Sequence, residues 1–316
     1  MKSIIEKAYA KINVGLQITG KRADGYHLLS MIMQTVSLYD RVGIYQTNDD
    51  DEISMDMDFG GSHPEEEITC DDSNLCVRAA KLITSRLPES HGYYIHLVKN
   101  IPIAAGMAGG STDAAAVLRG INALEGDIFS KKELCDMALP LGADVPYCID
   151  GGLCLCEGIG ERLTPIDESW RACILLAKPP KGVSTPAAYS WSDAHPDETH
   201  GDISAVINAI GNNDNEKIKK NIHNDLENAA KHFVPSISLI EQIMDDGGAV
   251  FSRVTGSGPT VFGVFDSDSE RKTVAARLRE SELCADIFSV EAVTPDYAAE
   301  REWKGIFYGT QNECKL

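Results

Sequence analysis

The chain has 316 residues, of which 43% are hydrophobic, and its formal net charge is −19. The hydrophobic content is enough for a packed core and argues against a disordered protein, while the acidity argues against nucleic acid as the main partner, because a phosphate-backbone binder needs a basic surface. No apolar run reaches the length of a membrane span, and the charged N-terminus lacks the apolar core of a signal peptide, so we expect a cytoplasmic protein without membrane association.

Residues 4–19 alternate between apolar and polar side chains, which predicts a half-buried strand. Lys11 and Asn13 share its polar face. Lys11 is either a solvent-facing lysine on an edge strand or a functional residue. Asp24 and Gly25 then predict a turn, and Tyr26 and His27, which follow it, either cap a core or stack on a ligand.

Residues 29–46 predict one or two further strands. The acidic segment 47–73 predicts a solvated hairpin or loop insertion. A helix is expected from Ser73-Asn74, which are good N-cap residues. A strand over 92–104 is expected to lead into a glycine-rich stretch. The elements expected after it are helices over 114–126 and 131–142 and a hairpin over 151–166.

The glycine-rich stretch 101–116, IPIAAGMAGGSTDAAA, connects the predicted strand to the predicted helix. Amides at a helix N-terminus lack backbone partners and the helix dipole is positive there, so glycines that let an anion approach them can form a phosphate cradle. The alternative is that Ser111, Thr112 and Asp113 are only helix caps. The stretch is neither a P-loop nor a dinucleotide fingerprint. TGSGPT, residues 255–260, is a second glycine-rich loop.

Asp144 lies in LGADVPYC. Pro146 favours an extended Val145, so we expect Asp144 just past a helix end, in a connecting segment. There it could accept a substrate proton or be an ordinary surface aspartate. Nine scattered cysteines without paired CxxC elements predict buried reduced thiols rather than a zinc site.

The composition changes near residue 165. A buried strand is expected from Cys173, a loop from Pro179-Pro180 onward that includes 190–202, and helices over 203–246. Two strands that flank TGSGPT, a helix over 269–282 and a strand over 284–293 follow. We therefore predict an α+β fold with an N-terminal domain (1–165), a C-terminal domain (166–295) and a tail (296–316) without a clear pattern.

Taken together, these stretches resemble the GHMP kinase superfamily. PIAAGMAGGSTDAA is similar to its phosphate loop, with Met107 and Thr112 as mild departures, and RVTGSGPTVF is similar to its C-terminal glycine motif. AYAKINVGLQITGKRADGYHLL, DDSNLCVRAA, LGADVPYCIDGGLCLCEGIGERL and HNDLE resemble the branch that phosphorylates an alcohol carrying a cytidine diphosphate group in isoprenoid synthesis. The resemblance covers roughly residues 5–295.

The resemblance implies an ATP-dependent phosphotransferase. Asp144 would take or orient the hydroxyl proton, and Lys11 would stabilise developing charge and keep the aspartate ionised. Asn13 would contact the substrate. Tyr26 and His27 would recognise the cytosine, with Tyr189, or its competitor Trp191, on the other side. Residues expected on the ATP side are Asn74, Lys99, Pro102, Ile103, Ala104, Ala105, Gly106, Met107, Ala108, Gly109, Gly110, Ser111 and Thr112.

The resemblance also implies a domain like ribosomal protein S5 domain 2 followed by a ferredoxin-like domain, with the site between them. Mg²⁺ is expected with ATP. Ser111 is its possible neighbour, and no firm protein ligand is assigned. The chain would act as a monomer or homodimer on a small molecule. The alternatives are another GHMP kinase, such as a homoserine or mevalonate kinase, and a non-catalytic nucleotide-binding relative.

Overall fold

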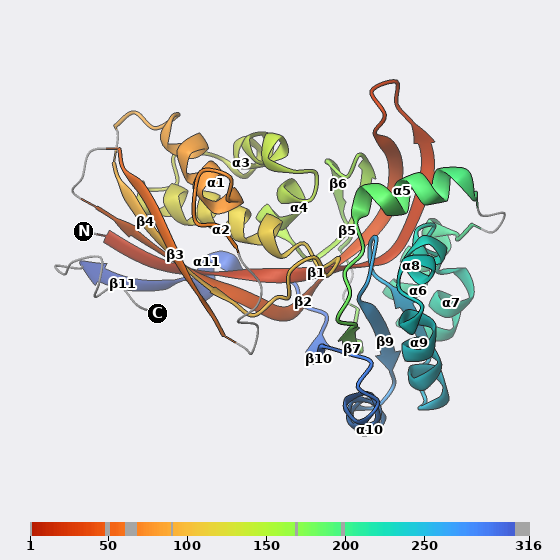
Figure 1. Cartoon of the computed structure of the whole chain (residues 1–316). Helices are drawn as coiled ribbons and strands as arrows, with labels where there is room; N and C mark the ends of the chain where they lie inside the picture. The colour runs from red at the N-terminus through yellow and green to blue at the C-terminus, as the bar shows by residue number, and fades with distance from the viewer. Residues whose placement is uncertain are drawn as a thin grey trace.

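Two β-sheets and the helices packed on them make up the protein (Figure 1). The computed structural model describes residues 2–47, 51–60, 68–89, 91–167, 170–196 and 200–306. Mixed strands and helices confirm the predicted α+β class. The chain crosses from the first sheet to the second between β6 (Arg162–Pro165) and β7 (Cys173–Lys178). The division into domains at residue 165 stays a prediction.

The first sheet has seven strands in the described residues, with the order β11-β1-β2-β4-β3, and β5 and β6 extend it from β2. β2 is one continuous strand, which first pairs with β5 and then with β4. The bounds are β1 (Lys2–Lys21), β2 (His27–Gln46), β3 (Ile53–Phe59), β4 (Tyr93–Lys99), β5 (Leu153–Gly158), β6 (Arg162–Pro165) and β11 (Glu302–Ile306).

Helices cover one face of this sheet, the upper face in Figure 1. Their apolar sides build a core with the strands, in which Val117 and Ile121 of α2 join Ile44 and Ile95. The bounds are α1 (Leu75–Thr84), α2 (Gly109–Leu124), α3 (Lys131–Ala138), the 3-10 turn η1 (Leu139–Leu141) and α4 (Val145–Asp150). Asn74 caps α1 as predicted, because its side chain accepts a hydrogen bond from the Cys76 amide.

The second sheet is antiparallel, with the order β10-β7-β9-β8. A second core joins the two sheets, in which Ile12 and Ile32 pack with Ile174 and Phe262. The bounds are β7 (Cys173–Lys178), α5 (Thr185–Ala194), α6 (Ile203–Gly211), α7 (Asn215–Asn221), α8 (Glu227–Phe233), α9 (Ser236–Asp246), β8 (Phe251–Val254), β9 (Val261–Phe265), α10 (Asp268–Glu280) and β10 (Asp286–Glu291).

Three expectations about connecting segments need correction. Segment 47–73 is not a hairpin, because β3 adds to the sheet parallel to β4; residues 48–50 and 61–67 lie outside the described residues. The segment after Pro179 is not all loop, because it contains α5. The tail contains α11 (Tyr297–Glu300) and β11, which pairs with β1; residues 307–316 lie outside the described part.

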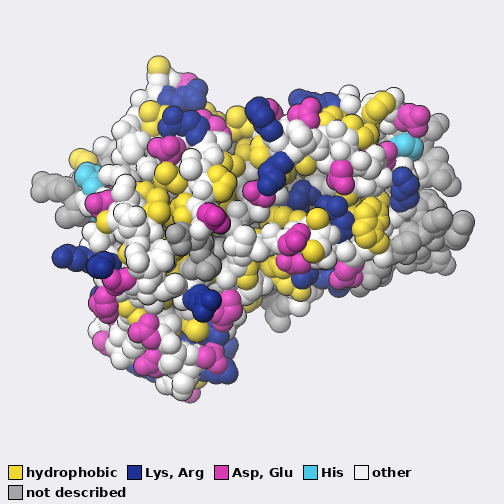
Figure 2. Space-filling view, turned by 180° about the vertical axis from the view of Figure 1, so that it is seen from behind, with side chains coloured by type: hydrophobic (Ala, Val, Ile, Leu, Met, Phe, Trp, Pro, Cys, Tyr) yellow, Lys and Arg dark blue, Asp and Glu magenta, His cyan; other side chains and the backbone are white. Residues whose placement is uncertain are grey.

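The surface mixes charges of both signs. On the face drawn in Figure 2, lysines and arginines are interspersed with aspartates and glutamates. In the part of the chain that the structure describes, no helix combines the length and apolar character needed to cross a bilayer. The cysteines of the described residues are free thiols. Cys76, Cys148, Cys154 and Cys156 are buried as predicted, whereas Cys70, Cys135, Cys173 and Cys284 are only partly buried.

Candidate active site

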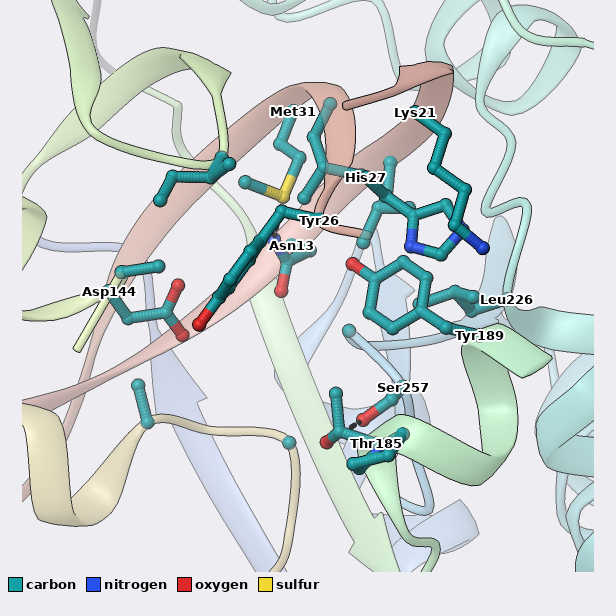
Figure 3. A pocket seen from close by; sticks show the side chains of 18 of the residues that line it. Asn13, Lys21, Tyr26, His27, Met31, Asp144, Thr185, Tyr189, Leu226 and Ser257 are labelled. Atoms are coloured by element: carbon teal, nitrogen blue, oxygen red, sulfur yellow. Dashed lines mark hydrogen bonds between the residues drawn. The ribbon is translucent and has the colours of Figure 1, made fainter. Parts of the chain in front are cut away.

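A cavity of about 740 Å³ contains both predicted catalytic side chains (Figure 3). Its walls come from β1, β2 and the turn between them, from both glycine-rich loops, from the N-terminus of α4 and from α5. Segments far apart in the sequence thus meet at one site. The two catalytic candidates, Lys11 and Asp144, lie where the cavity borders the first glycine-rich loop.

Lys11 is not solvent-facing, because only 4% of its surface is exposed. Its Nζ donates to Asn13 Oδ1 at 2.7 Å and to the Gly106 carbonyl at 3.1 Å, and lies 3.5 Å from Asp144 Oδ2. The hydrogen bond to Asn13 confirms that both residues share one face of the strand. These partners offset the cost of burying an ammonium group.

Asp144 occupies the N-cap position of α4, but its side chain makes no cap hydrogen bond. About a third of that side chain, 31%, is exposed to the cavity side. Asp144 follows η1, in a connecting segment as predicted. The prediction of an extended Val145 is wrong, because Val145 is the first residue of α4. Pro146 is tolerated there, since the missing N–H of a proline is not needed in the first helical turn. Because the Asp144 side chain makes no cap hydrogen bond and is partly exposed, its carboxylate is accessible to a ligand while it lies beside Lys11.

The first glycine-rich loop turns sharply before α2. Ala104, Gly106 and Ala108 all have left-handed backbone angles, with φ of 50°, 75° and 59°. Ala108 is the N-cap and offers no side-chain acceptor. The alternative that Ser111, Thr112 and Asp113 are caps is therefore wrong, since all three lie inside α2. The first amides of α2 keep their hydrogen-bonding capacity and can receive an anion.

The second glycine-rich loop packs directly on the first. A Cβ on Gly106 would lie 2.7 Å from the Thr255 carbonyl oxygen, so the close approach requires glycine. Thr255 Oγ1 accepts a hydrogen bond from the Asn13 amide at 2.8 Å. Asn224, of HNDLE, donates to the Val254 and Gly256 carbonyls at 2.8 and 2.9 Å. The two loops and β1 therefore form one connected unit.

A second cavity of about 520 Å³ also borders the first loop. Asn74 and Lys99 line it, as do Pro102–Ala105 and Gly109–Gly110. Gly106, Ala108 and Ser111 line both cavities. Met107 and Thr112 are buried and are absent from both linings. The loop is thus a shared wall between two chambers.

A buried cluster of charged residues, Lys99, Asp40 and Asp113, holds the first loop in place. Lys99 Nζ contacts Asp40 and lies 2.8 Å from Asp113 Oδ2. Burial raises the pKa of Asp113 well above its ordinary value, the Lys99 charge opposes that rise, and the Asp40 charge adds to it. Asp40 also accepts the Ile101 amide at 2.8 Å. The cluster therefore ties the start of the loop and the start of α2 to β2.

The first cavity also has aromatic side chains, from the turn between β1 and β2 and from α5. Tyr26 is 61% exposed, on the turn between β1 and β2, and its ring lies between Asp144 and the His27–Tyr189 pair in Figure 3. Tyr189 stacks on His27 with ring centroids 4.5 Å apart. His27 Nε2 lies 2.8 Å from Asp193 Oδ1. The pKa of Asp193 is lowered by hydrogen bonds from Lys21 and His27.

Trp191, the competitor of Tyr189, does not line the cavity. It stacks on His195 and His232, with ring centroids 4.2 and 5.3 Å away. The sequence interpretation missed Asp193, Thr185 and Ser257, which do line it. The sequence Ser184-Thr185-Pro186 indicates the start of α5, because proline in the first helical turn after a serine is typical of a helix N-terminus.

Comparisons with known proteins match this architecture. The family model described as the GHMP kinases N terminal domain matches residues 74–152, and the model described as GHMP kinases C terminal matches residues 206–282. The 4-diphosphocytidyl-2-C-methyl-D-erythritol kinase of Caldicellulosiruptor saccharolyticus is 42% identical over 276 residues, which cover 87% of this chain and 93% of that protein.

Two solved structures are similar in fold. A crystal structure of 4-(cytidine 5'-diphospho)-2C-methyl-D-erythritol kinase has a TM-score of 0.71 and 28% identity, and the match covers 92% of this chain and 99% of that one. The homoserine kinase of Cytophaga hutchinsonii has a TM-score of 0.74 over 95% and 97% of the two chains. Its identity is 18%, so that likeness shows the fold alone.

Proposed function

Because the chain belongs to the GHMP kinase family, we propose that it phosphorylates the 2-hydroxyl of 4-diphosphocytidyl-2-C-methyl-D-erythritol with ATP, in the non-mevalonate route to isoprenoids. One observation carries the proposal. Two cavities meet at the glycine-rich loop, and the lysine and the aspartate face the acceptor side of that wall. A kinase needs this arrangement, since donor and acceptor must approach from opposite sides.

The first glycine-rich loop fits the phosphates of a nucleoside triphosphate. The N-terminus of α2 offers uncapped amides and the positive end of a 16-residue helix. A Cβ on Gly109 would lie 2.9 Å from Lys99 Nζ, so this position at the start of α2 has no room for a side chain. Asn74 and Lys99 would line the adenosine side. When bound, ATP with Mg²⁺ would supply the γ-phosphoryl group; Ser111 would lie near the ion, and we assign Mg²⁺ no protein ligand.

Lys11 and Asp144 would divide the chemistry. The Asp144 carboxylate accepts the proton of the acceptor hydroxyl or orients it. Lys11 places a positive charge at the wall, where negative charge develops during transfer. Asn13 and Gly106 hold that ammonium, so no reorganisation is needed at the moment of transfer. Phosphoryl transfer asks mainly for such positioning and electrostatic stabilisation.

The aromatic side chains of the first cavity would bind the cytosine. Tyr26 offers an exposed ring for stacking, and the His27 imidazole, fixed by Asp193, offers a nitrogen for hydrogen bonding. Tyr189 would lie on the other side of the cytosine, although its ring already stacks on His27. A homoserine or mevalonate substrate has no base to use these side chains, which favours the cytidyl substrate over both. Buried Lys11 beside Asp144 also favours catalysis over a non-catalytic nucleotide-binding role.

A cytoplasmic location, and action as a monomer or homodimer, complete the proposal.

The test of this function is identification of the product. Incubation with Mg-ATP and 4-diphosphocytidyl-2-C-methyl-D-erythritol should give ADP and one new phosphate monoester. ³¹P and ¹³C NMR should place that ester on C2. An ester elsewhere, or hydrolysis of ATP without product, would contradict the proposal.

A further inference from the structure

Arg119 of α2 connects three structural elements through one guanidinium group. The residue is 6% exposed. Its Nη1 donates to the Cys148 carbonyl of α4 at 2.6 Å, and its Nη2 donates to the Lys7 carbonyl of β1 at 3.1 Å. Its Nε donates to Glu6 Oε2 at 3.2 Å. The rigid, planar fork therefore fixes both the distance and the angle between α2, α4 and β1.

The C-terminal segment covers this connection. The Tyr297 ring lies against the Arg119 guanidinium, 3.6 Å from ring centroid to Cζ. Arg301 Nε donates to the second oxygen of Glu6. Glu300 lies 3.0 Å from Lys7 Nζ and accepts the Tyr9 hydroxyl. Residues 297–301 thus shield the Glu6–Arg119 ion pair from water. An ion pair exposed to water would contribute little to stability.

Each of the three elements carries one part of the site. β1 carries Lys11, α4 begins after Asp144, and α2 begins with the phosphate loop. Arg119 itself lines neither active-site cavity. A misplacement of about 1 Å in such a site costs about 100-fold in rate.

We propose that Arg119 is a positioning residue for phosphoryl transfer, held in place by Tyr297 and Arg301 of the C-terminal segment. The expected loss of kcat rests on the proposed function. The expected effect on the positions of α2, α4 and β1 rests on the contacts alone. The segment that carries no pattern in the sequence is thereby part of the catalytic framework.

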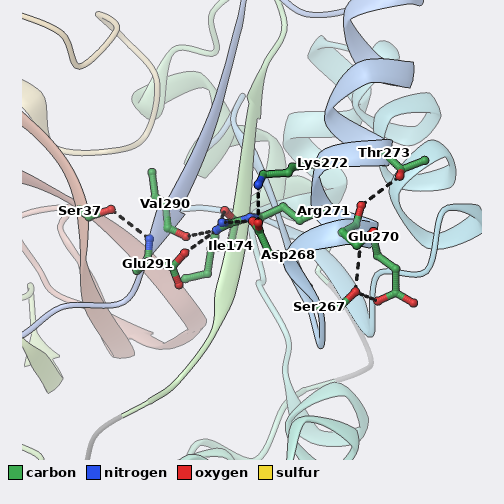
Figure 4. Close-up of polar contacts among 11 residues, drawn as sticks. Ser37, Ile174, Ser267, Asp268, Glu270, Arg271, Lys272, Thr273, Val290 and Glu291 are labelled. Carbon is green, nitrogen blue, oxygen red and sulfur yellow. Dashed lines mark hydrogen bonds and ion pairs between the residues drawn. The ribbon is translucent and has the colours of Figure 1, made fainter.

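Arg271 provides a matched control elsewhere in the molecule (Figure 4). It is 7% exposed, and it bonds the Val290 carbonyl at 2.8 Å, Glu291 at 2.7 Å and Asp268 at 2.6 Å. Like Arg119, it joins a helix to neighbouring strands through acids and carbonyls. The elements it joins, α10, β7 and β10, line neither active-site cavity.

The kinetic test compares Arg119→Lys with Arg271→Lys. We expect Arg119→Lys to lower kcat about 10- to 100-fold, with KM for ATP within about threefold, and Arg271→Lys to keep kcat within about twofold at a similar loss of Tm. Tyr297→Leu should lower kcat in the same direction by a smaller factor. Methylguanidinium should restore part of kcat to Arg119→Ala, through the cavity of about 550 Å³ beside the residue, and methylammonium should not.

A substrate-free measurement separates this inference from the proposed function. Hydrogen–deuterium exchange of the apo proteins should rise at 104–112 and 143–150 in Arg119→Lys and Tyr297→Leu, but not in Arg271→Lys. Equal exchange there in all three variants, or a wild-type kcat in Arg119→Lys, would overturn the positioning role. A wild-type protein inactive on the cytidyl substrate, with the exchange pattern intact, would overturn the proposed function only.

Discussion

The Lys11 ammonium lies 3.5 Å from the Asp144 carboxylate, at the wall that separates the two cavities. The lysine is almost fully buried and the aspartate side chain is partly exposed. This asymmetry suits the tasks we propose for them, because a cation that stabilises developing charge should stay fixed while a carboxylate that accepts a substrate proton has to reach it.

Replacing Asp144 by asparagine should abolish most proton acceptance while preserving shape. We expect kcat to fall about 10²- to 10⁴-fold and the Kd for ATP, measured by calorimetry, to stay within about threefold. Asp150→Asn is the matched control, since Asp150 lies on the same short helix and pairs with Lys131 at the surface. A kcat for Asp144→Asn within threefold of wild type would remove Asp144 from the mechanism.

Gly106→Ala should separate the two glycine-rich loops. The new methyl group would meet the Thr255 carbonyl at 2.7 Å, in addition to the cost of a positive φ. We expect kcat/KM for ATP to fall about 5- to 150-fold, since strain of about 1–3 kcal/mol acts at the site itself.

Gly126→Ala isolates the cost of the backbone angle. Gly126 also has a positive φ, but nothing lies within 4 Å of its added Cβ. It should lose stability without losing activity. If both variants lose kcat/KM equally, the loop contact has no catalytic role.

Tyr26→Ala should weaken binding of the cytidyl substrate alone. A stacked base contributes about 1–3 kcal/mol, so KM for that substrate should rise about 5- to 150-fold, while KM for ATP stays unchanged. Because Tyr26 is 61% exposed, Tm should change little. Tyr26→Phe keeps the ring and should behave like wild type. An equal rise in both KM values would argue against stacking.

Glu241 should make the protein less stable as the pH rises. It shares Lys231 with Glu227, each carboxylate 2.7 Å from the ammonium. Burial and the Glu227 charge raise the pKa of Glu241 to about 7, above its ordinary value of 4.5. The folded state therefore holds a proton that the unfolded state releases, and the associated stability, full below 4.5, is lost as pH rises through about 7.

Glu241→Gln tests this sign. At about pH 8 its Tm should exceed that of wild type, by about 2–4 °C for each kcal/mol gained in the free energy of unfolding. Near pH 5 this difference in Tm should shrink. Asp246→Asn, which changes an exposed residue of the same helix, should leave Tm unchanged at both pH values. A Glu241→Gln variant that is less stable than wild type at high pH would show that the charged form is favourable.

The strand that carries Lys11 and the first glycine-rich loop could be predicted because their signals are local. Alternation placed Lys11 and Asn13 on one face, and three glycines before an alanine-rich run marked the loop. What alternation could not show is that both faces of β1 are buried. The second core covers the apolar face of Ile12, as alternation predicts, but the two glycine-rich loops also cover the face of Lys11 and Asn13, which are 4% and 2% exposed.

The contacts between distant segments could not be predicted. The stacking of Tyr189 on His27 depends on α5 reaching the turn between β1 and β2. The connection of Arg119 to Tyr297 requires the tail to return beside β1. Neither leaves a periodic pattern, because each depends on a few side chains whose partners are set by topology rather than by spacing.

The most direct test of the account is a coupled ADP-release assay with Mg-ATP, run on 4-diphosphocytidyl-2-C-methyl-D-erythritol, its uridine analogue, homoserine and mevalonate. We predict turnover on the cytidyl substrate with a kcat/KM at least about 100-fold above each of the others. Equal or higher turnover on homoserine or mevalonate would contradict the assignment of Tyr26 and His27 to a base, and no turnover on any of them would contradict the kinase activity proposed for this site.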